Sequence, residues 1–467
     1  MEQHNKVRFE DEKPAPGVTV AQVQYRTIEV ERRVVVRSDV EVVDLNETEG
    51  TSRPSTATGD VEQPTRMTIN RVEEELCDPS LRSLHGSMNS NENEAEAPDT
   101  VTTTATAGNN NGALFSADTI DRYGFLRPQK SNNSCTSTNG LGHGPVADEN
   151  SLNPRDISTL RRREKKWLDM LDNWPHVMSK HYEKVRERCR KGIPSSLRGR
   201  VWIHLCGAHY HMTHPSSRHT FEQLDAHPGD PQWNDDIVKD LDRQFPEHEL
   251  FARESRYGRV GREELMRLLK AYTVLHPEEG YCQAHAPVAA MLLMHMPLRD
   301  AFYCFVQICH KYLPGYYSAG LDQVQMDGRI LHRILKKRAP STYKHFKQQD
   351  IDPVLYTIEW FMCIYCRTLP WATVLRIWDM FFCEGVKVLF KVALVLLRGS
   401  VGSKEQLKRL SDQHATLEVV KNIAGPITEE NFLVQKVCEV ELSEEELERC
   451  HYKEWKLNEK RMKNKTL

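Results

Sequence analysis

The sequence has no apolar run approaching the roughly 18 residues that a membrane-spanning helix needs. Its two most apolar stretches, residues 286–294 and 388–397, are too short, and Lys391 interrupts the second. The first residues, MEQHNKVRFEDEK, are polar and mixed in charge, which is not the pattern of a secretory signal. The sequence therefore predicts no transmembrane segment, and we expect a cytoplasmic protein.

The sequence also lacks an excess of charge of either sign. It carries 63 basic and 66 acidic side chains, for a net charge of -3. Nucleic-acid-binding proteins are typically strongly basic overall or over a domain, so we expect no nucleic-acid partner. The 12 cysteines are scattered, without the regular spacing of a disulfide framework, which favours reduced thiols.

Five residues of types that bind metals lie close together in the sequence. Structural zinc sites typically show paired Cys-x2-Cys spacing. The cluster here lacks that pairing and falls in an expected loop, so we predict no metal site. Its members are Cys206, His209, His211, His214 and His219.

Composition changes sharply near residue 155. The preceding residues are rich in Asn, Ser, Thr, Gly and Glu, and such segments bury too little apolar surface to offset the entropy of ordering. We predict a mostly disordered region over 1–155. Two islands interrupt it: a valine-rich stretch at 25–45, with some β propensity, and an aromatic stretch at 115–128 that is suited to docking on a folded domain.

After residue 155 the apolar residues recur with helical spacing. Expected helices include one through Leu197, Val201 and Trp202 that Gly207 ends, and others over 354–368, 404–422 and 443–461. Strand patterns are missing from this part of the sequence. The predicted fold is therefore all-α, with one multi-helix domain over 156–440 and a charged C-terminal helix or tail over 441–467.

The pair Cys363 and Cys366 has the spacing of a redox motif. We expect it in the middle of the helix over 354–368, among aromatic side chains. That setting favours an ordinary role in the hydrophobic core.

Four polar segments stand out, at 191–202, 237–246, 279–283 and 375–385. In the second, Asp240 and Arg243 are three residues apart on a helix expected to open at Asp235 or Asp236, with Val238 on its buried face. The carboxylate can hold the root of the arginine, whose planar guanidinium suits phosphate recognition. Taken alone, the same spacing is more typical of an ordinary surface ion pair.

In the third segment, a turn containing Gly280 leads toward a helix that is expected to hold Gln283 in its first turn. A neutral amide at that place can orient a water molecule or bond a backbone group. Taken alone, Gln283 is more typical of an ordinary loop glutamine whose hydrogen bonds are satisfied.

Together the four segments are much more specific, and over about residues 188–400 the sequence resembles the TBC-domain family of Rab GTPase-activating proteins. The matching motifs are Ile-x-x-Asp-x-x-Arg (Ile237, Asp240, Arg243), Tyr-x-Gln (Tyr281, Gln283), Gly-Ile-Pro…Arg-Gly-x-x-Trp (192–194, Arg198, Trp202) and Arg-x-Trp-Asp…Gly (376, Trp378, Asp379, 385).

The resemblance implies that Arg243 is an arginine finger and Gln283 a glutamine finger, both supplied in trans to a GTP-bound Rab. Arginine fingers are typically worth about 10³–10⁵ in rate. Asp240 would hold Arg243, while Tyr281 and Ile237 support the site. The chain would activate its partner rather than hydrolyse GTP alone.

The resemblance implies structural roles for Arg198, Trp202, Trp378 and Asp379. It implies no cofactor in this chain, because GTP and Mg²⁺ belong to the Rab partner.

Stretches such as DRYGF, HPGDPQW and LPGYY are similar to the subgroup that includes the ezrin-scaffold (PDZ-interacting) members. That similarity implies endosomal recycling, vesicle transport and recruitment to endosomal membranes or the cell cortex. The family often has Gly-Met after the glutamine; Ala284 and His285 stand there instead, which bears on the choice of Rab. The alternatives are a non-catalytic Rab-binding scaffold, and an adaptor that acts through residues 1–155.

Overall fold

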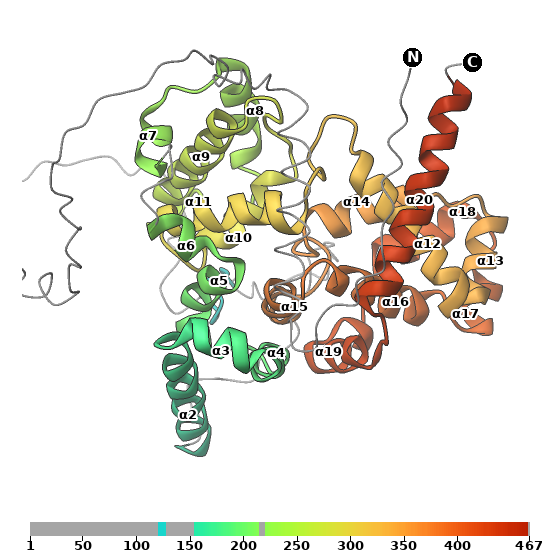
Figure 1. Ribbon diagram of the computed structural model, residues 1–467, viewed down its shortest axis with the longest axis horizontal. Helices are drawn as coiled ribbons and strands as arrows, with labels where there is room; N and C mark the ends of the chain where they lie inside the picture. Colours follow the sequence, from blue (N-terminus) through green and yellow to red (C-terminus); the bar gives the residue numbers. More distant parts are fainter. Residues whose placement is uncertain (1–119, 128–153, 214–219, 466–467) are drawn as a thin grey trace, which may run out of the picture. The chain divides into compact units, whose positions relative to one another are not determined.

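The computed structural model describes residues 120–127, 154–213 and 220–465 (Figure 1). All of them belong to one compact unit, Ala113–Leu467. The predicted disorder of residues 1–119 and 128–153, and the valine-rich stretch at 25–45, lie outside the described residues.

The described residues are helical apart from turns and two isolated β-bridges, Ile120↔Leu126 and Phe125↔His248, which confirms the all-α prediction. The first half contains α2 (Pro154–Leu171), α3 (Trp174–Lys180), α4 (Tyr182–Arg190), α5 (Arg198–Cys206), α6 (Ala208–Thr213), α7 (Phe221–Ala226), α8 (Pro231–Leu241), α9 (Gly258–Leu275), α10 (His285–Leu293) and α11 (Leu298–Gln307).

The second half continues after a π-helical turn, Ile308–Tyr312. It contains α12 (Asp322–Arg338), α13 (Pro340–Gln348), α14 (Val354–Met362), α15 (Trp371–Glu384), α16 (Lys387–Ser400), α17 (Lys404–Arg409), α18 (Gln413–Lys421), α19 (Glu430–Glu439) and α20 (Glu444–Lys465).

Two helices form the inside of the domain. Every residue of α10 is buried, as are residues 388–397 of α16; a helix that is apolar all round is expected inside a protein. Helix α10 packs against α9 and α11, and α16 packs against α15 and α19 (Figure 1). The two short apolar runs of the sequence are therefore core helices. No helix in the described part of the chain is long and apolar enough to cross a membrane.

Helix α5 follows its predicted pattern at one end only. It ends before Gly207, whose left-handed φ of +86° terminates the helix as predicted. Its first residue is Arg198, because Ser195–Leu197 form a separate 3-10 turn. Trp202 and Val201 are fully buried, so α5 belongs to the core.

Two predicted helices are shorter than expected. The helix over 404–422 is broken into α17 and α18, because the Asp412 carboxylate accepts a hydrogen bond from the Ala415 N–H and starts a new helix. Helix α14 ends at Met362, because Ile364 and Tyr365 adopt left-handed φ values of 49° and 60°. Cys363 therefore lies in a turn and not in mid-helix, although it is buried as expected.

The C-terminal helix α20 runs along α12 (Figure 1). Its start is capped by Ser443, whose hydroxyl accepts a hydrogen bond from the Glu446 N–H at 3.2 Å. The Glu446 carboxylate forms ion pairs with Lys337 at 2.7 Å and with Arg338 at 2.5 Å. Ion pairs to α12 therefore fix the base of α20.

Candidate functional site

Helix α8 carries the first half of the site, and it begins earlier than predicted. The Asp230 carboxylate accepts a hydrogen bond from the Gln232 N–H at 2.8 Å, and Pro231 occupies the first helical position. The buried face of α8 also differs from the expected one. Ile237 and Asp240 point inward, whereas Val238 is 55% exposed, so the predictions of a start at Asp235 or Asp236 and of a buried Val238 are wrong.

Asp240 joins the two motifs that the sequence keeps apart. Its carboxylate forms an ion pair with Arg243 Nη2 at 2.5 Å and accepts a hydrogen bond from the Tyr281 hydroxyl at 2.6 Å. The Asp240 side chain is 8% exposed, while that of Arg243 is 47% exposed. One buried carboxylate thus holds an outward-facing guanidinium on one side and the glutamine loop on the other.

Burial, followed by the hydrogen bond to Asp240, raises the pKa of Tyr281 well above its usual range. Tyr281 therefore stays protonated and donates to Asp240. The backbone is fixed as well, because the buried Gln244 amide donates to the Asp240 carbonyl at 2.9 Å. Arg243 itself lies two residues beyond the end of α8.

The loop that carries Gln283 is held from both ends. Gly280 has a φ of +66°, and a Cβ there would lie 2.4 Å from the Trp233 ring of α8, so only glycine fits without a shift. At the other end, His285 Nδ1 accepts a hydrogen bond from the Cys282 N–H at 3.1 Å. Burial lowers the pKa of His285 to about 3, which keeps the ring neutral and able to accept.

Gln283 is exposed between these two anchors and precedes α10 by two residues. The prediction that it lies in the first turn of the helix is therefore wrong. His285 is fully buried, so it can influence the choice of partner only through the loop. Arg243 and Gln283 are therefore both exposed. Asp240 connects them, because it contacts Arg243 directly and contacts Tyr281 in the loop that carries Gln283.

A second polar cluster lies deep in the domain around Asp379 of α15. This fully buried carboxylate accepts hydrogen bonds from the Ile193 N–H at 2.7 Å, from Trp202 Nε1 at 2.9 Å and from Arg198 Nε at 3.1 Å. Arg198 also donates to the Ile193 carbonyl at 2.8 Å. The cluster ties α5 and the loop before it to α15, and none of its side chains is exposed.

Trp378, beside Asp379, is fully buried and donates from Nε1 to the Ile364 carbonyl at 3.1 Å. It thereby secures the left-handed turn that ends α14. The four residues of these two motifs, Arg198, Trp202, Trp378 and Asp379, support the fold at positions removed from solvent.

We expect Asp379→Ala to lower the free energy of unfolding by about 3–5 kcal/mol, because it leaves the buried Arg198 charge without its partner. Burial raises the pKa of Asp379, against the lowering effect of Arg198. Urea unfolding followed by circular dichroism measures the change. The matched control is Asp236→Ala, which removes an exposed ion pair to Lys239 worth under about 1 kcal/mol; equal losses for the two variants would contradict the prediction.

The described residues contain no group of three or more His, Cys, Asp or Glu side chains arranged to hold a metal ion. Among the five candidate metal ligands of the sequence, Cys206 is fully buried, and its sulfur lies 3.5 Å from that of Cys304. His214 and His219 lie outside the described residues.

The aromatic stretch at 115–128 docks on the domain over its described part, residues 120–127, as predicted. Phe125 is buried and packs edge-on against His248 and Trp371, with ring centroids 5.0 Å apart in both pairs. Nothing in the sequence marks His248 or Trp371 as the residues that contact Phe125, because neither belongs to a motif.

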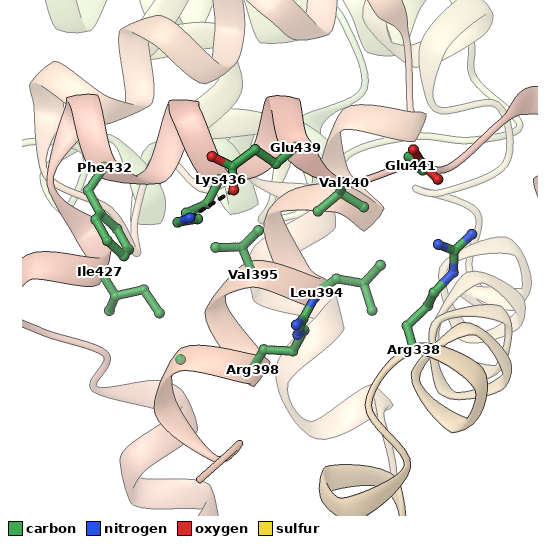
Figure 2. Close-up of a pocket in the computed structure, with 11 residues that line it drawn as sticks. Arg338, Leu394, Val395, Arg398, Ile427, Phe432, Lys436, Glu439, Val440 and Glu441 are labelled. Atoms are coloured by element: carbon green, nitrogen blue, oxygen red, sulfur yellow. Dashed lines mark hydrogen bonds and ion pairs between the residues drawn. The ribbon is translucent and has the colours of Figure 1, made fainter.

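A groove of about 500 Å³ lies elsewhere, between α16 and α19 (Figure 2). Val395, Ile427 and Phe432 give it an apolar floor, and Lys436 at its edge is paired with Glu439 at 2.8 Å. None of the motif residues lines it, so it is separate from the site around Asp240.

The chain is thus an all-helical domain in which Arg243 and Gln283 are exposed and the buried Asp240 carboxylate contacts Arg243 and Tyr281. The Rab-GTPase-TBC domain family matches residues 195–404. The chain is 43% identical to mouse Carabin over 70% of its own length and 69% of that protein, and 41% identical to the Drosophila melanogaster TBC1 domain family member whacked over 68% and 86%. The chain belongs to the Rab-GTPase-TBC domain family, as the sequence motifs indicate.

A further relative is mouse TBC1 domain family member 10A, 49% identical over 72% of this chain and 63% of that protein. The chain thus spans less than two thirds of this relative. These relatives are consistent with the subgroup that the sequence resembles. Among solved structures, the TBC domain of a Chlamydomonas flagellar RabGAP has a TM-score of 0.50, at 24% identity, over 69% of this chain and 100% of that domain; this supports the fold alone.

Proposed function

We propose that this chain is a GTPase-activating protein for a GTP-bound Rab, with Arg243 and Gln283 as fingers supplied in trans. The observation that carries the proposal is the shared carboxylate of Asp240, which holds Arg243 at 2.5 Å and Tyr281, two residues before Gln283, at 2.6 Å. Family membership supports it. Vesicle and endosome trafficking then follows as the process in which the chain acts.

The reaction is phosphoryl transfer from GTP to water, in which negative charge spreads over the γ-phosphoryl oxygens. An always-charged, planar guanidinium that projects from an anchored root suits that charge. A neutral amide suits the attacking water, since it both donates and accepts hydrogen bonds. GTP and Mg²⁺ would come with the Rab, and this chain would supply no cofactor.

Single-turnover hydrolysis across a panel of purified, GTP-loaded Rab proteins tests the proposal. We expect strong acceleration with one or a few members of the panel and little with the rest. Binding without acceleration, seen across the whole panel, would instead support the scaffold alternative. The adaptor alternative predicts that cellular effects persist when Arg243 is replaced, because the N-terminal 155 residues would carry them.

Recruitment to a membrane is also part of the proposal, and the outer face of α20 supports it. Tyr452 is 54% and Trp455 48% exposed, with their rings stacked at 6.4 Å, and Lys456 lies over the tyrosine ring. Glu454 is buried against Arg333 of α12, and Tyr452, two residues earlier, lies about 200° around the helix from it, on the opposite face. Aromatic rings beside lysines suit an anionic bilayer surface.

We expect the protein to sediment with vesicles containing phosphatidylserine and to stay in solution with phosphatidylcholine vesicles. The double variant Tyr452→Ser, Trp455→Ser should weaken sedimentation by about tenfold, because two apolar ring surfaces are lost. Phe432→Ser, which removes an exposed aromatic ring from α19, is the matched control. Equal binding by wild type and the double variant would refute this surface.

A further inference from the structure

Residues 120–127 lie outside the matched family region and pair with the loop that follows Arg243. We call residues 120–127 the clasp and residues 242–249 the arginine loop. The Leu126 N–H donates to the Glu247 carbonyl at 2.7 Å, and the Glu249 N–H donates to the Gly124 carbonyl at 2.8 Å. Two backbone hydrogen bonds therefore join segments that are more than a hundred residues apart.

The clasp has a turn of its own. The Asp121 carboxylate accepts hydrogen bonds from the Tyr123 N–H at 2.8 Å and the Phe125 N–H at 2.9 Å. Gly124 has a φ of +91°, and a Cβ at this position would lie 2.5 Å from His248 Nε2. The turn thus brings backbone against the His248 ring at a place where only glycine fits.

His248 bridges the clasp and the arginine loop. Its Nδ1 accepts a hydrogen bond from the Leu250 N–H at 3.1 Å, which leaves the proton on Nε2 to be donated to the Tyr123 carbonyl at 2.9 Å. Burial lowers the pKa of His248 to about 4. The ring is therefore neutral near pH 7 and satisfies one group on each side.

The arginine loop contains a conformation that needs support. Phe245, two residues after Arg243, has a φ of +41°, and a residue other than glycine in this region costs about 1–3 kcal/mol. Its ring packs edge-on against Trp371 at 5.4 Å, and Phe125 packs against the same indole at 5.0 Å. The clasp and the strained residue thus share one aromatic support.

We propose that the clasp holds the arginine loop in this backbone conformation, which makes Phe125 and Gly124 positioning residues for Arg243. The assignment rests on the proposed function, since it is Arg243 that the loop presents. It also gives a segment outside the family region a part in the reaction, because loss of the clasp frees the loop that carries the backbone of Arg243.

Hydrogen exchange of the full chain tests the contact without any GTPase present. In Phe125→Ala we expect the amides of Leu126, His248 and Glu249 to exchange about tenfold faster or more, because the loop opens locally. Gly124→Ala should act in the same direction. The matched control is Phe346→Ala, which removes a fully buried ring from α13 and should leave these amides unchanged.

Single-turnover hydrolysis with the Rab that the wild type activates tests the positioning. For Phe125→Ala we expect the rate constant at saturating activator to fall about 10- to 100-fold, as for a displaced catalytic group, with half-saturation unchanged. Phe346→Ala should retain the wild-type rate constant. Where Phe125→Ala fails to fold, Phe125→Leu keeps apolar volume without the ring and is measured in its place.

The outcomes separate the two claims. Unchanged exchange in the folded Phe125 and Gly124 variants overturns the clasp. Faster exchange with an unchanged rate constant overturns the positioning role. A wild type that accelerates no Rab overturns the proposed function, and in that case the exchange data still decide whether the clasp holds the loop.

Discussion

Arg243→Ala should lower the GTP hydrolysis rate constant of the activated Rab by about 10³- to 10⁵-fold, the range typical of arginine fingers. The reason is the loss of the charge that, in the proposed function, would face the γ-phosphoryl oxygens in the transition state. The fold should survive, because the side chain is 47% exposed and Asp240 keeps its hydrogen bond from Tyr281. Single-turnover hydrolysis at saturating activator measures the loss directly.

The conservative variant Arg243→Lys separates charge from shape. A lysine at this position keeps one positive charge but lacks the planar fork that binds two oxygens at once, so we expect only partial activity. Binding of the Rab in its GTP form should change little in either variant, since the finger acts in the transition state. Full acceleration by Arg243→Ala would remove Arg243 from the mechanism.

The sequence predicted the helical class because its strongest signals are local. Apolar spacing in α10 and α16, and Gly207 at the end of α5, depend on residues within a few turns of one another. Helix ends were less predictable where one polar residue decides them. Asp412 starts a new helix inside an otherwise periodic stretch, and Pro231 with its Asp230 cap starts α8 ahead of the two acidic residues that looked suitable.

The site was predicted as separate motifs, and the contacts between them were not. The spacing of Asp240 and Arg243 predicts their ion pair, because it is a contact within one turn of chain. Nothing local predicts that Tyr281 reaches the same carboxylate, which lies 41 residues earlier in the chain. The same holds for Asp379 and Trp202, 177 residues apart, since tertiary packing brings these residues together.

Gln283→Ala should lower the rate constant by about 10²- to 10³-fold, the range typical of losing one side-chain hydrogen bond that acts in the transition state. An alanine leaves the water without a hydrogen-bonding partner from this chain. The loop itself should keep its conformation, because the hydrogen bonds from the Tyr281 hydroxyl to Asp240 and from the Cys282 N–H to the His285 ring do not involve the Gln283 side chain. Single-turnover hydrolysis with the same Rab measures the effect.

The control is Gln348→Ala, an exposed glutamine at the end of α13, which should retain the wild-type rate constant. If Gln283 and Arg243 act on one transition state, the double variant Arg243→Ala, Gln283→Ala should lose much less than the product of the single losses, because the residues then work as a unit. Strictly multiplicative losses would mean that the two residues contribute independently. A wild-type rate in Gln283→Ala would leave Arg243 as the finger and assign the water to the Rab.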